Sequence, residues 1–457
     1  MNMRSHMKRA VAVAIFGALA GCSLTPQYER PKADLPESWV EPTVVTSTDS
    51  STEWNDVFQD AELEQLMTEA LAANHDLAAA TIRIEQAKAT AKIASSRLVP
   101  YASTSVGGSR QKALNGARSL SSSDDSRLSV SYELDLWGAN RANVQAAAAR
   151  VAAREYDMQT TRLVLQADVA SYYFQTLALK DRLAIARKNL EAARSLMSLV
   201  EVRYDKGAAS GLDVAQQRTA LLNIEAEVPQ LQQSLTETQS ALALLLGRVP
   251  RDFTIRTETL ADVQPPAIAA GQPADLLQRR PDVRAAEAEL VAANADIGVA
   301  RAALYPSMEL SATGVVTNWL TGGSAGVAAL AASLSQILFD GGELRGQVQL
   351  ADASRRELVE TYLQTVLTSV KEVNDSLSAV STAERRTSLL MQTVEQAQLA
   401  LRLATTRYQA GSEDLLTVLE SQTSQLNAED SLVQAKLARV NASITLFKAL
   451  GGGWSAT

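Results

Sequence analysis

The chain has 457 residues, 46% of them hydrophobic and only 5% aromatic, and a formal net charge of −8. An acidic chain without a basic stripe argues against nucleic-acid binding, and a single cysteine, Cys22, excludes a disulfide within the chain. Outside the expected signal the only histidine is His75, and no metal-ligand cluster, phosphate-binding loop or nucleophilic serine motif accompanies it. We therefore expect neither an enzyme nor a metal site.

Residues 1–21 have the pattern of a signal peptide, with a basic start followed by an apolar run over residues 10–20. That run is too short to span a bilayer, which takes about 20 residues. It ends in the sequence LAGC, which resembles the lipobox of bacterial lipoproteins and implies that Cys22 carries a covalent lipid. The residue after Cys22 is Ser23 and not Asp, which implies sorting to the outer membrane. We expect no other cofactor, and no later stretch is long and apolar enough to predict a transmembrane helix.

Residues 22–60 are rich in proline, serine, threonine and acids and predict an extended lead. Trp39, Trp54 and Phe58 are expected to dock this lead on the body of the protein. The first repeat comprises residues 61–250 and begins with apolar residues at helical spacing. The pattern is interrupted around His75, which we expect to be a cap or surface residue. Proline at position 100 ends this pattern because it cannot continue the hydrogen-bond ladder.

A β-hairpin is predicted at about residues 101–137. Apolar and polar residues alternate from residue 128 to 136, which predicts a strand with one apolar and one polar face. Residues 101–110 form a weaker strand candidate, and the polar residues 111–126 between them predict a long loop. Such hairpins are typical of outer-membrane barrels.

Residues 139–205 contain neither proline nor glycine and predict one helix of roughly 100 Å at 1.5 Å per residue. Apolar residues recur at spacings of three and four along it and along the return helix that follows, as in a coiled-coil seam. Pro229 should bend the return helix or mark a break there. A helix of this length must belong to a rod or a barrel of helices.

The proline-rich residues 251–280 predict a linker, after which residues 281–450 repeat the first half. A hairpin is expected at about 305–340 with its return strand at 328–339, a long helix at 342–408, then a turn and a return helix. Residues 451–457 form a tail.

The repeat is most evident at the breaks after the two long helices. Arg203, Tyr204 and Gly207 match Arg407, Tyr408 and Gly411 at an offset of 204 residues (407 − 203). A repeat at so long a period indicates two halves of one fold. The two breaks are therefore predicted to be equivalent turns at one end of the helices.

Each chain thus offers four strands, too few to close a barrel, and an open sheet edge is not tolerated in lipid. Two copies would pool eight strands and three would pool twelve, and a transport duct favours three because the smallest barrels let little through. We therefore predict an α+β membrane protein. Its parts are a trimeric twelve-stranded outer-membrane barrel and a long α-helical barrel stacked under it.

Several segments resemble those of the TolC-type outer-membrane efflux factors, in the lipoprotein branch that serves resistance-nodulation-division pumps. They are WNDVF at 54–58, DLLQRRPDVRAAE at 275–287, AANA at 292–295 and ARAALYPS at 300–307. The likeness runs from the lipobox nearly to Trp454. It implies a homotrimer in the outer membrane, lipid-anchored and spanning, with a periplasmic tunnel. It also implies a passive exit duct for drugs or other small amphiphiles, a periplasmic adaptor protein and an inner-membrane pump of the resistance-nodulation-division type.

The resemblance also places a gate. In this branch a leucine and an acid one helical turn later constrict the lumen after the second turn, and here these positions are Leu416 and Glu420. The family often has Asp where this chain has Glu420. Asp213, Glu413 and Asp414 lie close by in sequence, and threefold symmetry would turn each acid into a ring that selects cations. Each of these acids could equally be a solvated surface charge, and Leu416 could serve ordinary packing between helices.

The residues of the two turns are expected to serve the turns themselves and the docking of the adaptor. They are Arg203, Tyr204, Gly207, Arg407, Tyr408 and Gly411. The glycines would allow close backbone approach. Two other functions stay open: a type I-like duct for secreted proteins, and a structural coiled-coil lipoprotein without a pore. The alternating strands argue against the second.

Overall fold

The computed structural model describes residues 23–40, 58, 60–112, 120–251, 253–261, 263–265, 268–320 and 322–452. The expected signal peptide (1–21), the lipidation site Cys22, Trp54 and the end of the expected tail, including Trp454, lie outside these residues. Trp39 is buried and its indole N–H donates to the carbonyl of Gly271 (2.9 Å), so this part of the lead does dock.

Helices make up most of the described chain. In chain order the elements are α3 (Ala61–Ala73), α4 (His75–Ser96), β1 (Tyr101–Lys112), β2 (Leu120–Leu134), α5 (Ala139–Asp205), α6 (Gly211–Leu245), the 3-10 turn η1 (Pro273–Asp275), α7 (Leu276–Arg279), α8 (Pro281–Ala302), β3 (Ser307–Thr317), β4 (Ala325–Ser335), α9 (Glu343–Gln409) and α10 (Leu415–Ala449). Among the described residues, no helix is both long enough and apolar enough to cross a membrane.

The internal repeat is visible in the lengths of the helices. The pairs α5 and α9 have 67 residues each, α6 and α10 have 35 each, and α4 and α8 have 22 each. The bounds of α5 agree with the helix expected at 139–205, and α9 begins and ends one residue later than the helix expected at 342–408. Sequence periodicity therefore located the long helices to within a residue.

Two compact units divide the chain. The first takes its members from residues 1–33, 81–156 and 284–365, and the second from residues 34–80, 157–283 and 366–457. The units differ from the predicted halves 61–250 and 281–450, because each unit draws on both halves. The physical reason is that equivalent segments of the two repeats pack on each other, as β2 pairs with β3 in the first unit.

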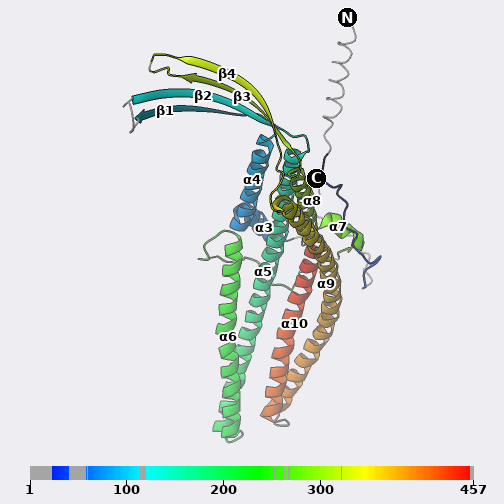
Figure 1. The fold of residues 1–457 in the computed structure, drawn as a ribbon. Helices are drawn as coiled ribbons and strands as arrows, with labels where there is room; N and C mark the ends of the chain where they lie inside the picture. The colour runs from blue at the N-terminus through cyan, green and yellow to red at the C-terminus, as the bar shows by residue number, and fades with distance from the viewer. Residues whose placement is uncertain are drawn as a thin grey trace. The chain divides into compact units, whose positions relative to one another are not determined.

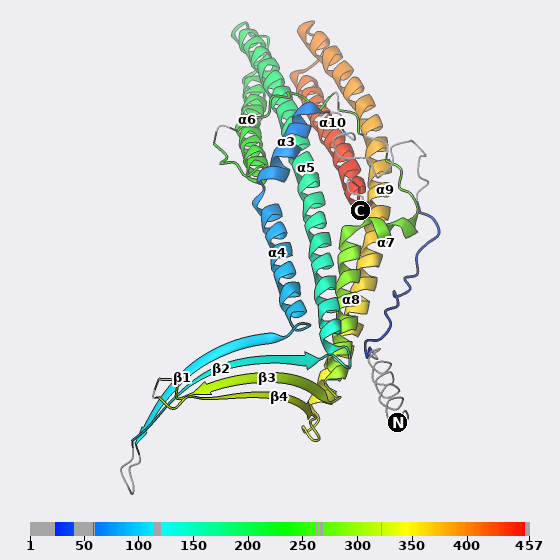
Figure 2. The same cartoon turned by 90° about the horizontal axis from the view of Figure 1, so that it is seen from above.

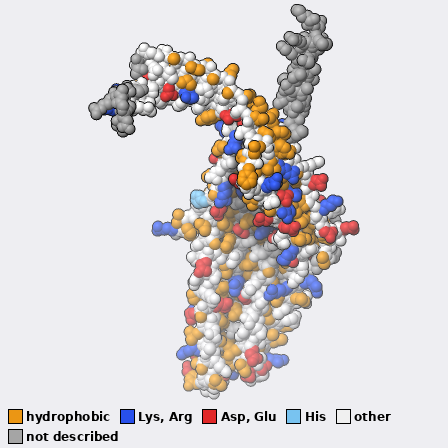
Figure 3. Space-filling model, in the orientation of Figure 1, with side chains coloured by type: hydrophobic (Ala, Val, Ile, Leu, Met, Phe, Trp, Pro, Cys, Tyr) orange, Lys and Arg blue, Asp and Glu red, His pale blue; other side chains and the backbone are white. Residues whose placement is uncertain are grey.

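The first unit contains one antiparallel sheet in the order β1-β2-β3-β4, whose strands lie side by side and curve together (Figures 1 and 2). Its register pairs Tyr101 with Ser131 and Ser307 with Ser335. Hydrophobic side chains lie exposed along the strands, among them Val106, Leu128 and Leu330, and Figure 3 shows such side chains over the sheet. The sheet therefore presents apolar surface that the chain itself does not cover.

The predicted loop at 111–126 is wrong in extent. β1 continues to Lys112 and β2 already begins at Leu120, so most of this polar stretch is paired strand. A ladder joins backbone groups and needs no apolar face, and here polar side chains pair across it: the hydroxyls of Ser109 and Ser123 are 2.9 Å apart. Polarity therefore indicated a loop where the backbone forms a strand.

Two smaller expectations also needed correction. The return strand β4 ends at Ser335 instead of 339, because its partner strand begins at Ser307, directly after Pro306, which has no N–H to donate. Of the two outcomes expected at Pro229, a bend or a break, the break does not occur, because α6 runs through that residue. Pro229 lies on the exposed side of the helix, where water can bind the carbonyl that loses its partner.

The second unit is a set of helices around an aromatic and aliphatic core. Phe58 packs on Phe174 with ring centroids 5.2 Å apart, and the buried Tyr173 donates its hydroxyl to Asp60 (2.8 Å). Smaller clusters follow along the α5/α6 pair, with Leu183, Leu231 and Ile224 among their members. These clusters are the apolar seams that the spacing of three and four predicts.

Candidate gate and turns of the helical hairpins

Two turns join the long helices to their return helices in the second unit. Gly207 (φ 72°) and Gly411 (φ 79°) adopt the left-handed conformation that ends a helix without strain. In the first turn the N–H of Gly207 donates to Tyr204 O (2.9 Å) and that of Ala208 to Arg203 O (2.7 Å). The second turn has the same two hydrogen bonds: the N–H of Gly411 donates to Tyr408 O (3.0 Å) and that of Ser412 to Arg407 O (3.0 Å). The glycines thus set the two turns to one geometry.

The return helices begin with side-chain caps that use two of the expected turn acids. Ser210 and Asp213 form a capping box on α6, in which Ser210 N donates to Asp213 Oδ2 (2.7 Å). Asp414 caps α10 and accepts from Thr417 N (2.9 Å). Hydrogen bonds from Thr417 lower the pKa of the Asp414 carboxyl. Glu413 lies 3.9 Å from the exposed Arg407. Asp213 and Asp414 are therefore already engaged in holding the helix ends.

The two turns contact each other through Arg203 and Tyr408. The Arg203 guanidinium donates to Tyr408 O (2.7 Å) and lies 4.4 Å above the centroid of the Tyr408 ring. Tyr408 is only 4% exposed and belongs to a cluster with Val200, Leu415 and Val418. Its burial raises the pKa of the phenol. This clasp joins the first helical hairpin, α5/α6, to the second, α9/α10.

The predicted gate residues lie at the start of α10 on its uncovered side. Leu415 and Val418 are buried, whereas Leu416 remains 49% exposed and Glu420 is exposed one turn later. Leu416 borders a shallow groove of about 390 Å³, whose lining also includes Gln216 and Leu419. The fold thus places the apolar side chain of Leu416 and the carboxylate of Glu420 one helical turn apart on the same exposed face. The contacts described for the chain include no partner for Glu420.

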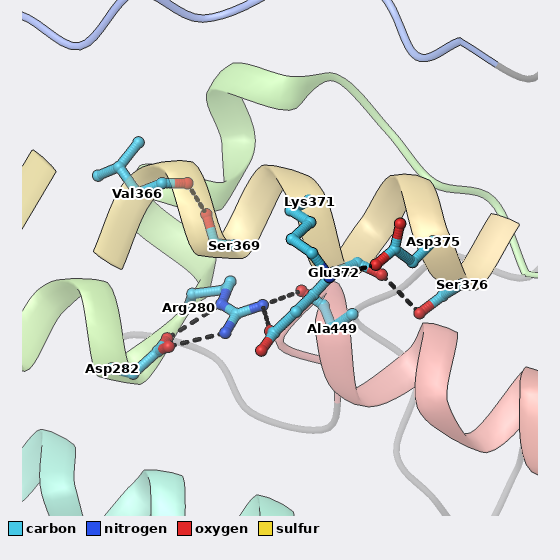
Figure 4. Close-up of polar contacts among 9 residues, drawn as sticks. All are labelled: Arg280, Asp282, Val366, Ser369, Lys371, Glu372, Asp375, Ser376 and Ala449. Atoms are coloured by element: carbon cyan, nitrogen blue, oxygen red, sulfur yellow. Dashed lines mark hydrogen bonds and ion pairs between the residues drawn. The ribbon is translucent and has the colours of Figure 1, made fainter. Parts of the chain in front are cut away.

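The far ends of both return helices are held by residues that the sequence analysis did not single out. Arg280 is 8% exposed and donates to Asp282 (2.7 and 3.0 Å), to Glu372 (2.7 Å) and to Ala449 O (3.0 Å), the last residue of α10 (Figure 4). A guanidinium suits this place because it also neutralises the negative end of a helix. The only signal in the sequence was the RRPD segment, which appeared above solely as part of a resemblance.

The first repeat has a counterpart of Arg280. Asn74, 206 residues earlier (280 − 74), donates to Leu245 O (3.0 Å), the last residue of α6, and its Oδ1 caps α4 by accepting from Asp76 N (2.9 Å). Asn74, not the exposed His75, is therefore the cap at this helix break. A neutral amide in one repeat and a charged hub in the other bind equivalent carbonyls.

The paired helical hairpins with matching turns, and the curved four-stranded sheet that exposes apolar side chains, agree with the class that the comparisons with known proteins show, an outer-membrane efflux channel. The profile described as "outer membrane efflux protein" matches residues 66–248 and 273–452. The chain belongs to this outer membrane efflux protein family.

Individual relatives match nearly end to end. The pyoverdine export outer membrane protein OpmQ of Pseudomonas putida is 38% identical over 459 residues, covering 96% of this chain and 96% of that protein. The toluene efflux pump outer membrane protein TtgF of Pseudomonas putida is 32% identical over 473 residues, covering 99% and 98%. The crystal structure of the open state of the Neisseria gonorrhoeae MtrE outer membrane channel superposes with a TM-score of 0.86 at 29% identity, covering 94% and 98%.

Proposed function

We propose that this protein is the outer-membrane exit duct of a tripartite efflux system and passively carries small organic molecules from the periplasmic side to the outside. The observation that carries the proposal is the match to efflux channels over nearly the whole chain, including both helical hairpins. The relatives named above export pyoverdine and toluene, two chemically different cargoes. A duct that accepts drugs and other small amphiphiles is consistent with that range.

The duct would be a homotrimer. Every residue of β4 is exposed in the single chain, and β1 and β4 form the two edges of the sheet. An unpaired edge is not stable in lipid, so β4 of one copy would pair with β1 of the next. Three copies would give a barrel of about twelve strands, wide enough for an aqueous lumen. The helical hairpins of the three copies would form the tunnel below it, and a lipid on Cys22 would anchor each copy in the outer membrane.

Two further partners belong to this proposal. A periplasmic adaptor would engage the turns, and a pump of the resistance-nodulation-division type in the inner membrane would supply the energy. A Cβ added at Gly207 or Gly411 would meet no atom of the described residues within 4 Å apart from its own chain neighbours, so the backbone of both turns is open to a partner. Close approach of a second backbone is what glycine permits.

The gate would consist of Leu416 and Glu420. In a trimer the exposed leucines would form an apolar ring, and one turn further the carboxylates would form a ring of like charges that favours cations. Asp213, Glu413 and Asp414 would add negative potential around the turns. The caps that Asp213 and Asp414 form leave Glu420 as the acid most available to the lumen.

Single-channel recording of the trimer in a lipid bilayer tests the duct and its gate together. The double variant Leu416→Ala/Glu420→Ala should widen the closed constriction and raise basal conductance. The matched control is Leu212→Ala, which changes the counterpart of Leu416 in the first turn, at the 204-residue offset (416 − 212), and should leave conductance unchanged. Equal conductance in the wild type and the gate variant would place the constriction elsewhere. No conductance from any of these proteins would defeat the duct and favour a structural coiled-coil lipoprotein.

Cargo is tested separately in a deletion strain. Loss of tolerance to toxic organic solvents, or loss of export of a small siderophore, supports a small-molecule duct. Unchanged tolerance together with the loss of a secreted protein would favour a protein-secretion duct instead.

A further inference from the structure

The internal repeat gives every residue of one turn a counterpart in the other, and two such counterparts have opposite surroundings. Tyr408 is 4% exposed under the Arg203 guanidinium, whereas Tyr204, its counterpart 204 residues earlier (408 − 204), is 51% exposed. Arg407, the counterpart of Arg203, is exposed as well. The repeat thus supplies a second arginine and tyrosine of the same kind, Arg407 and Tyr204, which do not form this contact within the chain.

The surface around each arginine is also repeated. Leu199 lies one helical turn before Arg203 on α5, on the same face, and packs against the cluster that contains Tyr408. Leu403 stands in the same relation to Arg407 on α9, but it is 53% exposed. The second long helix therefore carries a leucine and an arginine suited to a tyrosine that no described residue of its own chain supplies.

We propose that Leu403 and Arg407 of one copy pack against Tyr204 of a second copy of this chain, in the geometry that Leu199, Arg203 and Tyr408 show within one chain. The Arg407 guanidinium would donate to the carbonyl of the neighbour's Tyr204 and lie over its ring. A contact of this kind is head-to-tail, because different surfaces of the two copies meet, and it closes a ring when the rotation per copy is right. The inference rests on the proposed trimer and assigns residues to the interface at its helical turns.

Two other contacts compete for these residues. Glu413 lies 3.9 Å from Arg407 within the chain, but an ion pair of that length with an exposed arginine is weak and would not prevent exchange. An adaptor protein could instead cover Tyr204. The second copy is favoured because the chain itself displays the geometry of the contact, with each participant in place at one offset.

Photocrosslinking distinguishes these occupants. Tyr204 is replaced by the crosslinking amino acid p-benzoylphenylalanine, and the purified full-length protein is irradiated without adaptor after light scattering has established its oligomeric state. We expect a covalent dimer on denaturing gels, with the crosslinked peptide derived from α9 around Leu403 and Arg407. The matched control carries the same amino acid at Tyr408 and should crosslink to α5 of its own chain, without a dimer band.

The outcomes separate the interface from the duct itself. A trimer in which position 204 forms no dimer, or crosslinks to elements other than α9, overturns the inference and leaves the proposed function standing. A crosslink that appears only after adaptor is added assigns Tyr204 to the adaptor and also overturns it. A protein that stays monomeric in lipid contradicts both proposals. The cysteine pair Tyr204→Cys/Arg407→Cys, oxidised to an interchain disulfide, provides a second test if the first variant folds poorly.

Discussion

The two helical hairpins have the same backbone and different side-chain chemistry. On the first, α5/α6, Arg194 and Glu225 form an exposed ion pair (2.9 Å). At the counterpart positions of the second, α9/α10, Gln398 donates to Glu429 (2.9 Å), and Glu429 is only 8% exposed. Gln425 also donates to this carboxylate (2.8 Å). A surface charge pair in one hairpin has thus become a buried carboxylate held by amides in the other.

The same divergence recurs at both ends of the hairpins. At the turns, Leu415 covers Tyr408, whereas its counterpart Gly211 has no side chain and leaves the ring of Tyr204 uncovered. At the far ends, the neutral Asn74 and the charged Arg280 bind equivalent carbonyls, each at 3.0 Å. The two hairpins therefore share their turn glycines and helix lengths, and hence their backbone. The side chains packed on that backbone distinguish the second hairpin from the first.

The largest expected effect is on the second hairpin, at Arg280. Arg280→Ala would remove three anchors and leave the carboxylates of Asp282 and Glu372 without their cation. Loss of one partner from a buried ion pair costs about 3–5 kcal/mol, and because both acids are partly exposed we expect about 2–4 kcal/mol here. Arg280→Lys should recover only part of this, since lysine cannot make the forked contacts. The measurement is urea unfolding of the protein in detergent, followed by far-ultraviolet circular dichroism.

Asn74→Ala is the matched change in the first hairpin and should cost about 1–2 kcal/mol, through loss of a cap and one hydrogen bond. If the Asn74 and Arg280 variants unfolded at the same urea concentration, the charge of Arg280 would contribute nothing beyond the carbonyl contact. The two hairpins would then be equivalent at this end.

The sequence predicted the parts of this comparison that depend on local chemistry. The turns at Gly207 and Gly411 and the bounds of α5 follow from helix breakers and apolar spacing. The Arg280 hub could not be predicted in the same way, because its partners Glu372 and Ala449 are remote in sequence and meet only after folding. The contrast between the buried Tyr408 and the exposed Tyr204 could not be predicted either, because both tyrosines stand in the same sequence motif.

An effect of equal size in the two hairpins is expected at the glycines that follow the return helices. Gly247 (φ 67°) and Gly451 (φ 69°) both have a left-handed backbone, and an added Cβ would lie 2.6 Å from the carbonyl oxygen of Ala73 or of Arg279. Alanine at either site should therefore cost more than the roughly 1–2 kcal/mol of the backbone conformation alone. Gly411→Ala is the control, because its Cβ would meet open space and only the backbone cost applies.

Thermal unfolding of the three variants compares these sites directly. The Gly247→Ala and Gly451→Ala proteins should melt at similar temperatures, below that of Gly411→Ala. A clear difference between the first two would show that the repeats are less equivalent in packing than in backbone geometry.

The smallest single effect, at Glu225, belongs to the polar pairs midway along the hairpins, and there the contrast between the two pairs is itself the prediction. Glu429→Ala would leave the partly buried amides of Gln398 and Gln425 without their shared acceptor, which should cost about 1–3 kcal/mol. Glu225→Ala would remove an exposed ion pair, with both side chains about half exposed, and should cost about 0.2–1 kcal/mol. Raising the salt concentration should abolish the small Glu225 effect, because exposed charges are screened, and should leave the Glu429 effect nearly intact. Urea unfolding at low and high salt measures both. Equal costs, or a Glu429 effect that vanishes in salt, would mean that water reaches the buried carboxylate and that the second hairpin is no more tightly packed there than the first.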